Sequence, residues 1–239
     1  PCVNAVDQMT LFISKQAVVN AGDDATICET GTYTISGATA LNATSLTWST
    51  SGDGTFSSTS IQNPVYTPGL TDISNGNVTL TLTATSATPC GNASDFMVLT
   101  INAQATAFAG DDATICEGSA YTISDAVATD AASILWTSNG TGSFDDATDQ
   151  NPTYTPSAAD RLNGSIILTM TVTSASPCVN AVDQMTLFIS KQAVVNAGDD
   201  ATICETGTYT ISGATALNAT SLTWSTSGDG TFSSTSTLN

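Results

Sequence analysis

The sequence predicts an all-β protein built from tandem antiparallel β-sandwich domains, and three observations carry that prediction. The string GDDATICE begins at Gly22, Gly110 and Gly198, a step of 88 residues each time. Between these markers apolar residues alternate with threonine at a period of two, as in strands with one buried face. Clusters of Gly, Asn, Asp and Ser separate the alternating runs. About seven short strands per unit are typical of a two-sheet sandwich.

The domain boundaries follow from the alternating apolar strand that closes each unit. The complete units are therefore residues 17–104 and 105–192. Residues 1–16 carry the last strand of a preceding repeat, and residues 193–239 carry the N-terminal part of a further repeat. Because neither partial repeat can bury its own apolar face, we expect the chain to be a window on a longer array.

Two variants of the unit alternate along the chain. Residues 1–60 recur unchanged as residues 177–236, whereas adjacent units agree at about half of their positions. A long identical block with an abrupt end is what recombination among tandem copies leaves.

Within the first unit the strands are expected in a fixed order. Alternation marks runs at 33–35, 46–48, 78–84 and 96–101, with turns between them such as 51–54 and 75–76. Pro64 and Pro68 flank another short run, which we place at a sheet edge or corner because proline cannot donate to a ladder.

The order Cys28, Trp48, Cys90 resembles the Cys, Trp, Cys layout of immunoglobulin-type domains. Tryptophan recurs at the same step as the marker string, and on a third-strand position it packs under the sheet. We therefore assign the three tryptophans to the domain cores: Trp48, Trp136 and Trp224.

The six cysteines are expected to form disulfides in an oxidising compartment. Pairing within units joins Cys28 to Cys90 and Cys116 to Cys178, leaving Cys2 and Cys204 with partners outside the chain; pairing across junctions joins Cys90 to Cys116 and Cys178 to Cys204. We favour the first scheme because the second separates its sulfurs by two consecutive strands. The first has its own difficulty, since strict immunoglobulin topology places Cys28 and Cys90 near opposite ends of the sandwich.

Composition excludes several classes of function. The chain has 21 acidic residues, three basic residues and no histidine, for a net charge of -18. The absence of imidazole removes Ser/His/Asp and Cys/His relays, and three cations cannot neutralise a nucleic-acid backbone. No apolar run approaches the roughly 18 residues that a membrane span requires. We expect no enzyme, no nucleic-acid partner and no membrane insertion.

A pair of acidic residues follows each junction, and these residues are candidate ligands of a calcium ion. They are Asp23, Asp24, Asp111, Asp112, Asp199 and Asp200. Calcium takes six to eight oxygen ligands. Asp72 or Asp160 and Asp95 or Asp183 are candidate companions. The alternative is that Gly-Asp-Asp forms a turn held by side-chain to backbone hydrogen bonds. The spaced acids of a dedicated calcium loop are missing, which weighs against calcium. We expect that the repeats require no cofactor, with calcium as the one candidate.

The motifs AGDDATICE, YTIS, SGDGTF, NPxYTP, NGxVTLT and PCxNxxDxMTLxI follow one another in order. Together they resemble the PKD-like, Ig-like tandem repeats of giant Bacteroidota cell-surface adhesins, including those of gliding motility. The resemblance covers both complete units and both partial ones. It implies an extended filament on the bacterial outer surface, exported by the type IX system and joined to motility or secretion machinery through other regions.

The first function that follows is adhesion, in which the repeats themselves contact glycan or an abiotic surface. Two further functions stay open. One is a passive spacer or stalk, in which each unit contacts only its neighbours and a distal tip binds. The other is a carbohydrate-binding accessory module of a secreted enzyme, which would need exposed aromatic side chains.

Overall fold

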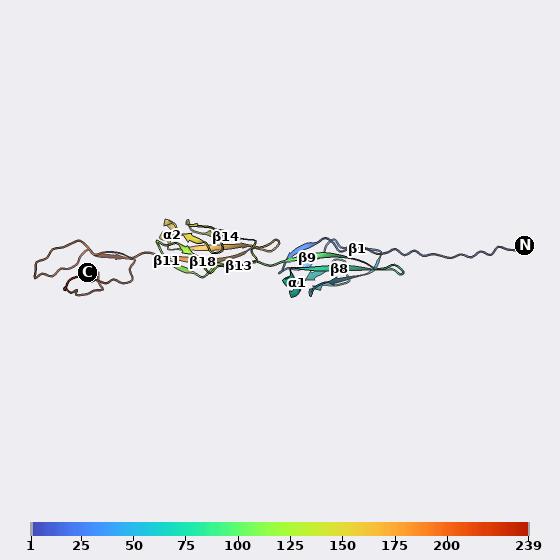
Figure 1. The fold of residues 1–239 in the computed structure, drawn as a ribbon, viewed down its shortest axis with the longest axis horizontal. Coiled ribbons are helices and arrows are strands. Elements are labelled where there is room, and N and C mark those ends of the chain that lie inside the picture. Colours follow the sequence, from blue (N-terminus) through green and yellow to red (C-terminus); the bar gives the residue numbers. More distant parts are fainter. Residues whose placement is uncertain (1, 239) are drawn as a thin grey trace. The chain divides into compact units, whose positions relative to one another are not determined.

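The computed structural model describes residues 2–238; residues 1 and 239, the outermost positions of the two partial repeats, lie outside the described residues. The chain separates into two compact units. The first comprises Pro1–Ala107, Ala128–Ile134 and Thr171–Val182, and the second comprises Phe108–Val127, Leu135–Met170 and Asp183–Asn239. Figure 1 shows the strands and the short helices along the chain.

The first complete repeat has one four-stranded sheet and two smaller ones. The large sheet has the order β2-β9-β8-β5, in which β2 runs parallel to β9 and the other neighbours are antiparallel. Its strands are β2 (Ala25–Cys28), β5 (Ala43–Thr50), β8 (Asn77–Ser86) and β9 (Ala93–Asn102). The smaller sheets are β3 (Tyr33–Thr34), β7 (Val65–Thr67) and β6 (Thr55–Phe56), and the pair β1 (Val18–Asn20) with β4 (Thr39–Leu41).

The second complete repeat has the same strand orders. Its large sheet is β11 (Ala113–Cys116), β18 (Ala181–Ser190), β17 (Ser165–Thr173) and β14 (Ser133–Ser138). Its smaller sheets are β12 (Tyr121–Thr122), β16 (Thr153–Thr155) and β15 (Ser143–Phe144), and the pair β10 (Thr106–Phe108) with β13 (Val127–Thr129). Each complete repeat is an Ig-like β-sandwich, which confirms the predicted fold class.

The core of the first repeat lies between its sheets. Every second residue of β8 is buried, so the threonine alternation marks the solvent face as predicted. Trp48 and Tyr66 are 2% and 0% exposed, and Phe56 lies between them with ring centroids 5.7 and 4.9 Å away. Trp136 occupies the equivalent buried position in the second repeat.

Period-two patterning missed two short helices, α1 (Leu70–Asn75) and α2 (Ala158–Asn163). Six residues are too few to display a 3.6-residue period. Each helix ends at a glycine in the left-handed region, Gly76 with φ 72° and Gly164 with φ 78°, which is the conformation that stops a helix there.

The segment between Pro64 and Pro68 was predicted to lie at a sheet edge or corner, and the edge placement is wrong. Strand β7 is the centre of its three-stranded sheet. The prolines lie just beyond its ends, so no ladder donor is lost, and the Pro64 carbonyl accepts a hydrogen bond from Ile35 N at 3.0 Å.

The partial repeats depart from expectation because their partner strands are not in the chain. Residues 2–16 form no strand, although a last strand was predicted there. In residues 193–238 the described strands are β19 (Val194–Asn196) and β20 (Thr215–Leu217). Trp224 is half-buried rather than buried, because the segments equivalent to β8 and β9, which cover Trp48, are absent from the sequence.

Candidate functional site

The last strand of the first repeat ends beside its second strand. In the parallel pair of β2 and β9, Cys28 is level with Asn102. Glu29 fixes both sides of this end: its N–H donates to Asn102 O at 2.9 Å, and its Oε1 accepts from Gln104 N at 3.0 Å. The segment that leaves the repeat is therefore held against the residue that follows Cys28.

That segment binds the hairpin between β17 and β18, and both belong to the first compact unit. Ala105 N donates to Ser174 Oγ at 3.2 Å, and Ser174 Oγ donates to Val179 O at 2.6 Å. Gln104 Nε2 donates to Ser174 Oγ at 3.2 Å and to Val179 O at 2.5 Å. Ser174 is 6% exposed, so its hydroxyl is a buried bridge between the segment and the hairpin.

A disulfide completes these contacts between residues 102–105, Glu29 and the hairpin between β17 and β18, which together we call the joint. Cys28 is bonded to Cys178, with Cα atoms 4.9 Å apart and a sequence separation of 150 residues. Cys178 Sγ also lies 3.3 Å from Asn102 O, the residue level with Cys28. Both sulfurs therefore converge on the end of β9.

The favoured pairing within units is wrong, and so is the alternative across each junction. Cys90 and Cys116 carry free thiols, as do Cys2 and Cys204. The reason for the first error is distance: Cys28 is level with the end of β9, whereas Cys90 precedes its start. A strand of ten residues spans about 30 Å, far more than the ~7 Å between Cα atoms that a disulfide tolerates.

In the first two pairs, the second acid accepts a backbone hydrogen bond. Asp24 Oδ1 accepts from Val98 N at 2.7 Å, and Asp112 Oδ1 accepts from Thr186 N at the same distance. The companions Asp95 and Asp183 accept from Ala21 N and Ala109 N, both at 2.8 Å. Asp23, Asp111, Asp199 and Asp200 are exposed.

The structure does not bring these acids together as a calcium site. Residues 2–238 contain no group of three or more Asp, Glu, Cys or His side chains placed to share a metal ion. Asp24 and Asp112 bind backbone N–H groups 74 residues away, in β9 and β18, so these hydrogen bonds differ from the local turn of the alternative interpretation.

Asp72 and Asp160 are also hydrogen-bonded in place, each 1% exposed within its repeat. Asp72 accepts from Tyr66 Oη at 2.6 Å, from Gly54 N and Gly69 N at 3.1 Å, and from Asp53 N at 3.2 Å. The carboxylate thereby joins α1 to the loop before β6 and to the strand that carries Tyr66. This explains the SGDGTF motif, since a Cβ on Gly54 would lie 2.3 Å from Tyr66 Oη.

These contacts shift the ionisation of the groups involved. Burial, together with the hydrogen bond to Asp72, raises the pKa of Tyr66 to about 12. In the second repeat burial also raises the pKa of Tyr154. For Asp160 burial acts upward, but hydrogen bonds from Thr141, Ser157 and Tyr154 outweigh it and hold the pKa below its ordinary value.

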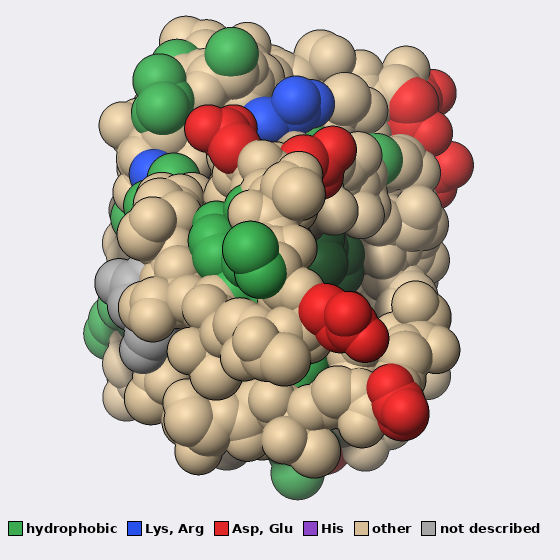
Figure 2. Space-filling model, turned by 90° about the vertical axis from the view of Figure 1, so that its left-hand side faces the viewer, with side chains coloured by type: hydrophobic (Ala, Val, Ile, Leu, Met, Phe, Trp, Pro, Cys, Tyr) green, Lys and Arg blue, Asp and Glu red, His purple; other side chains and the backbone are tan. Residues whose placement is uncertain are grey.

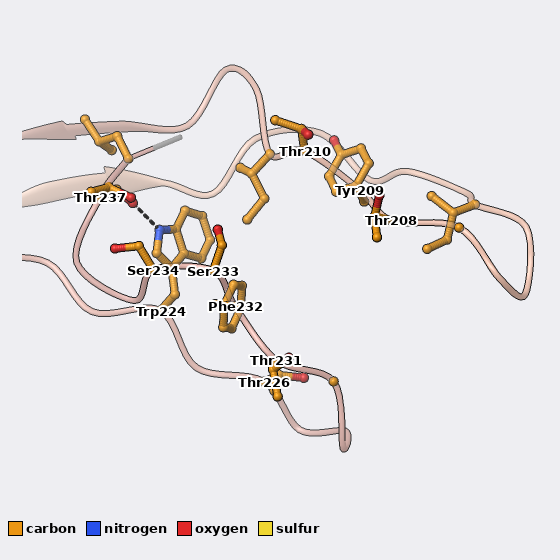
Figure 3. A pocket seen from close by; sticks show the side chains of 15 residues that line it. Thr208, Tyr209, Thr210, Trp224, Thr226, Thr231, Phe232, Ser233, Ser234 and Thr237 are labelled. Carbon is orange, nitrogen blue, oxygen red and sulfur yellow. Dashed lines mark hydrogen bonds between the residues drawn. The ribbon is translucent and has the colours of Figure 1, made fainter.

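A pocket in the C-terminal partial repeat is lined by Tyr209, Trp224 and Phe232 (Figure 3). Trp224 Nε1 donates to Thr237 O at 2.8 Å, as Trp48 Nε1 donates to Ile61 O at 3.2 Å in the first repeat. The ring centroids of Trp224 and Phe232 are 5.9 Å apart, close to the 5.7 Å of Trp48 and Phe56. The pocket is therefore half of a domain core, open where the covering strands are not in the chain.

Acidic side chains lie apart from one another on the face that Figure 2 shows. On the face drawn in Figure 2, Asp and Glu side chains are spread among uncharged polar atoms, with few Lys or Arg. None of the helices in the described chain has the length and apolarity needed to cross a bilayer.

Sequence reasoning missed the polar residues of the joint, Glu29, Gln104 and Ser174. A signal was present, because each recurs at the repeat step: Glu29 closes the marker string, Gln104 closes the unit, and Ser174 precedes the Pro-Cys pair by three residues. Gln104 binds Ser174 and Val179 of the next repeat, and Glu29 binds Gln104, so spacing within one unit could not reveal that the three act together.

Comparison with known proteins identifies similar folds and no family. No family model matches the chain, and no curated protein matches it. Among solved structures, Drosophila N-cadherin is 14% identical with a TM-score of 0.43, covering 73% of this chain and 49% of that chain. A protocadherin gammaB7 cis-dimer is 14% identical with a TM-score of 0.41, covering 74% and 49%. A titin I-band fragment is 12% identical with a TM-score of 0.46, covering 77% and 68%. The chain thus spans about half the length of these two cadherin chains.

Proposed function

We propose that the chain is a repeat segment of a long bacterial cell-surface adhesin, which links a cell to its surroundings and takes part in gliding motility or attachment. The observation that carries the proposal is the closed joint: a disulfide, a glutamate and a buried serine hold the end of one repeat to the hairpin of the following one. A protein whose task is reach and resistance to pulling needs such joints.

The remaining features support the same proposal. Threonine-rich outer strand faces and a net charge of -18 keep parallel chains soluble and apart. Persistent disulfides are typical of extracellular compartments. The order of motifs resembles adhesin repeats of Bacteroidota, which is the basis for placing the chain on the outer surface.

A catalytic role has no support among the described residues. Three of the candidate carboxylates, those of Asp24, Asp95 and Asp72, accept hydrogen bonds from backbone N–H groups. The carbohydrate-binding alternative gains no support from Trp48 and Tyr66, which are buried. The exposed aromatic side chains of the complete repeats are the phenylalanines Phe96, Phe108 and Phe188. The passive spacer differs from the adhesive repeat only in whether these units themselves contact the ligand.

Fluorescent antibody against residues 17–192 on intact living cells tests the proposal. We expect surface labelling without permeabilisation, while an antibody to a cytosolic protein labels only permeabilised cells. Label that travels along the cell body would support the motility role, and static label would support attachment. Label confined to permeabilised cells would refute the proposal.

A further inference from the structure

The disulfide between Cys28 and Cys178 joins two different positions of the repeat. Cys28 is the first cysteine of one repeat, and Cys178 is the second cysteine of the next repeat. No other pair among the six cysteines has the same roles and the same separation of 150 residues. Partners for the other four would lie at that separation in adjoining repeats.

The first half of the joint is already formed at Cys116. In the second repeat Cys116 is level with Ser190, as Cys28 is level with Asn102. Glu117 N donates to Ser190 O at 3.0 Å, and Glu117 Oε1 accepts from Gln192 N at 3.0 Å. These hydrogen bonds reproduce those of Glu29, although the Cys116 thiol is free and exposed.

The second half of the joint is already formed at Cys90. Ala17 N donates to Ser86 Oγ at 2.8 Å, and Ser86 Oγ donates to Gly91 O at 2.7 Å, as in the hairpin that carries Cys178. Cys90 Sγ lies 3.3 Å from Ser14 O, the same distance as Cys178 Sγ from Asn102 O. The segment of a preceding repeat therefore reaches this hairpin in the same way, so Cys90 occupies the position of Cys178.

We propose that the disulfide is periodic: the first cysteine of every repeat is bonded to the second cysteine of the repeat that follows, so the array is covalently closed at each junction. The partner of Cys116 is then the second cysteine of a following repeat, and the partner of Cys90 is the first cysteine of a preceding one. Each bond forms from two thiols, whose two electrons and two protons pass to a disulfide oxidant that is reduced to two thiols.

Periodic pairing has a mechanical consequence that pairing within repeats lacks. Each disulfide bypasses 150 residues of chain. A pull along the array then passes through the disulfides and the short stretches beside them, so unfolding of a repeat releases little of its length. This consequence holds whatever the repeats bind.

The identical blocks offer a direct test, because the array can be lengthened in register. Joining residue 236 to a second copy of residues 61–239 continues the sequence with its period intact. Cysteine number rises from six to ten, and the new repeats supply partners for Cys116 and Cys204. Both chains are refolded with glutathione and its disulfide, alkylated without reduction, and weighed intact.

Periodic pairing predicts four alkylated thiols in both chains, because the three bonds of the longer chain use six of its ten cysteines. Pairing within repeats would leave two thiols in both chains, and pairing between adjacent cysteines across each junction would leave none in either. Either result would overturn the proposal. Cys28→Ser in the original chain distinguishes the schemes again: periodic pairing predicts five thiols, and pairing within repeats predicts three. Four thiols in the original chain with any other number in the longer one would also refute periodicity.

Discussion

Replacing Asp72 by alanine tests whether the buried carboxylate organises the first repeat. The change leaves three backbone N–H groups without an acceptor in a site that is 1% exposed, and the Tyr66 hydroxyl keeps only its contact with Thr50 Oγ1. Each buried donor left unsatisfied costs about 1–3 kcal/mol, and because part of the loop relaxes we expect a total of about 3–5 kcal/mol. That loss approaches the whole stability of a small domain.

Hydrogen exchange followed by mass spectrometry measures the effect repeat by repeat. We predict that amides of β8 exchange about a hundredfold to a few thousandfold faster, since each 1.4 kcal/mol is a factor of ten. Peptides of β17 in the second repeat serve as the internal standard. Asp23→Ala removes an exposed carboxylate of the same repeat and is the matched control, with an expected change below about 0.5 kcal/mol. Unchanged protection of β8 in Asp72→Ala would refute the reasoning.

Three other predictions concern the same repeats and their charge. The folded-state pKa of Tyr66 is raised to about 12. Its contribution to stability is therefore complete below the ordinary pKa near 10 and is lost as pH rises from there to about 12. Urea titrations at a series of pH values should show this loss in the unaltered chain and a smaller loss in Tyr66→Phe; an equal loss in both would contradict the assignment. Gly54→Ala should lower the midpoint of thermal unfolding of the first repeat because its Cβ meets Tyr66 Oη, whereas Gly91→Ala, with no atom within 4 Å, should not; equal shifts would refute the steric account. Chains with a charge of -18 should stay apart at low salt and associate more with added salt or divalent cations, and light scattering that is insensitive to salt and chelator would exclude this.

Much of the fold could be predicted because the repeat and the period-two alternation are properties of single strands. The alternation in residues 78–84 places every second side chain in the core, and the structure agrees. The short helix α1 escaped because it is set by its terminal glycines and by Asp72 rather than by a pattern of apolar residues. Strand β7 was misplaced because proline limits pairing only inside a strand, and Pro64 and Pro68 lie outside it.

The candidate site was harder to predict because its partners belong to different repeats. Cysteine order within one unit resembled an immunoglobulin pair, but pairing depends on which ends of the sheet the sulfurs occupy. Cys28 lies on a strand parallel to β9, at the end where the chain leaves the repeat, and this topology is not visible in spacing. The acids were read as metal ligands because composition shows their number and not the backbone donors that face them.

Pulling a single chain from residues 16 and 192 tests the central claim most directly, namely that neighbouring repeats are locked together against tension. Without reductant, full unfolding should release about 500 Å less chain than with reductant, because the disulfide shelters 150 residues at about 3.3–3.6 Å each. Cys28→Ser should release the longer length in both conditions, and Cys116→Ser should behave as the unaltered chain does. Equal released lengths with and without reductant would contradict the account. So would a Cys116→Ser chain in which the difference between the two conditions falls to about half.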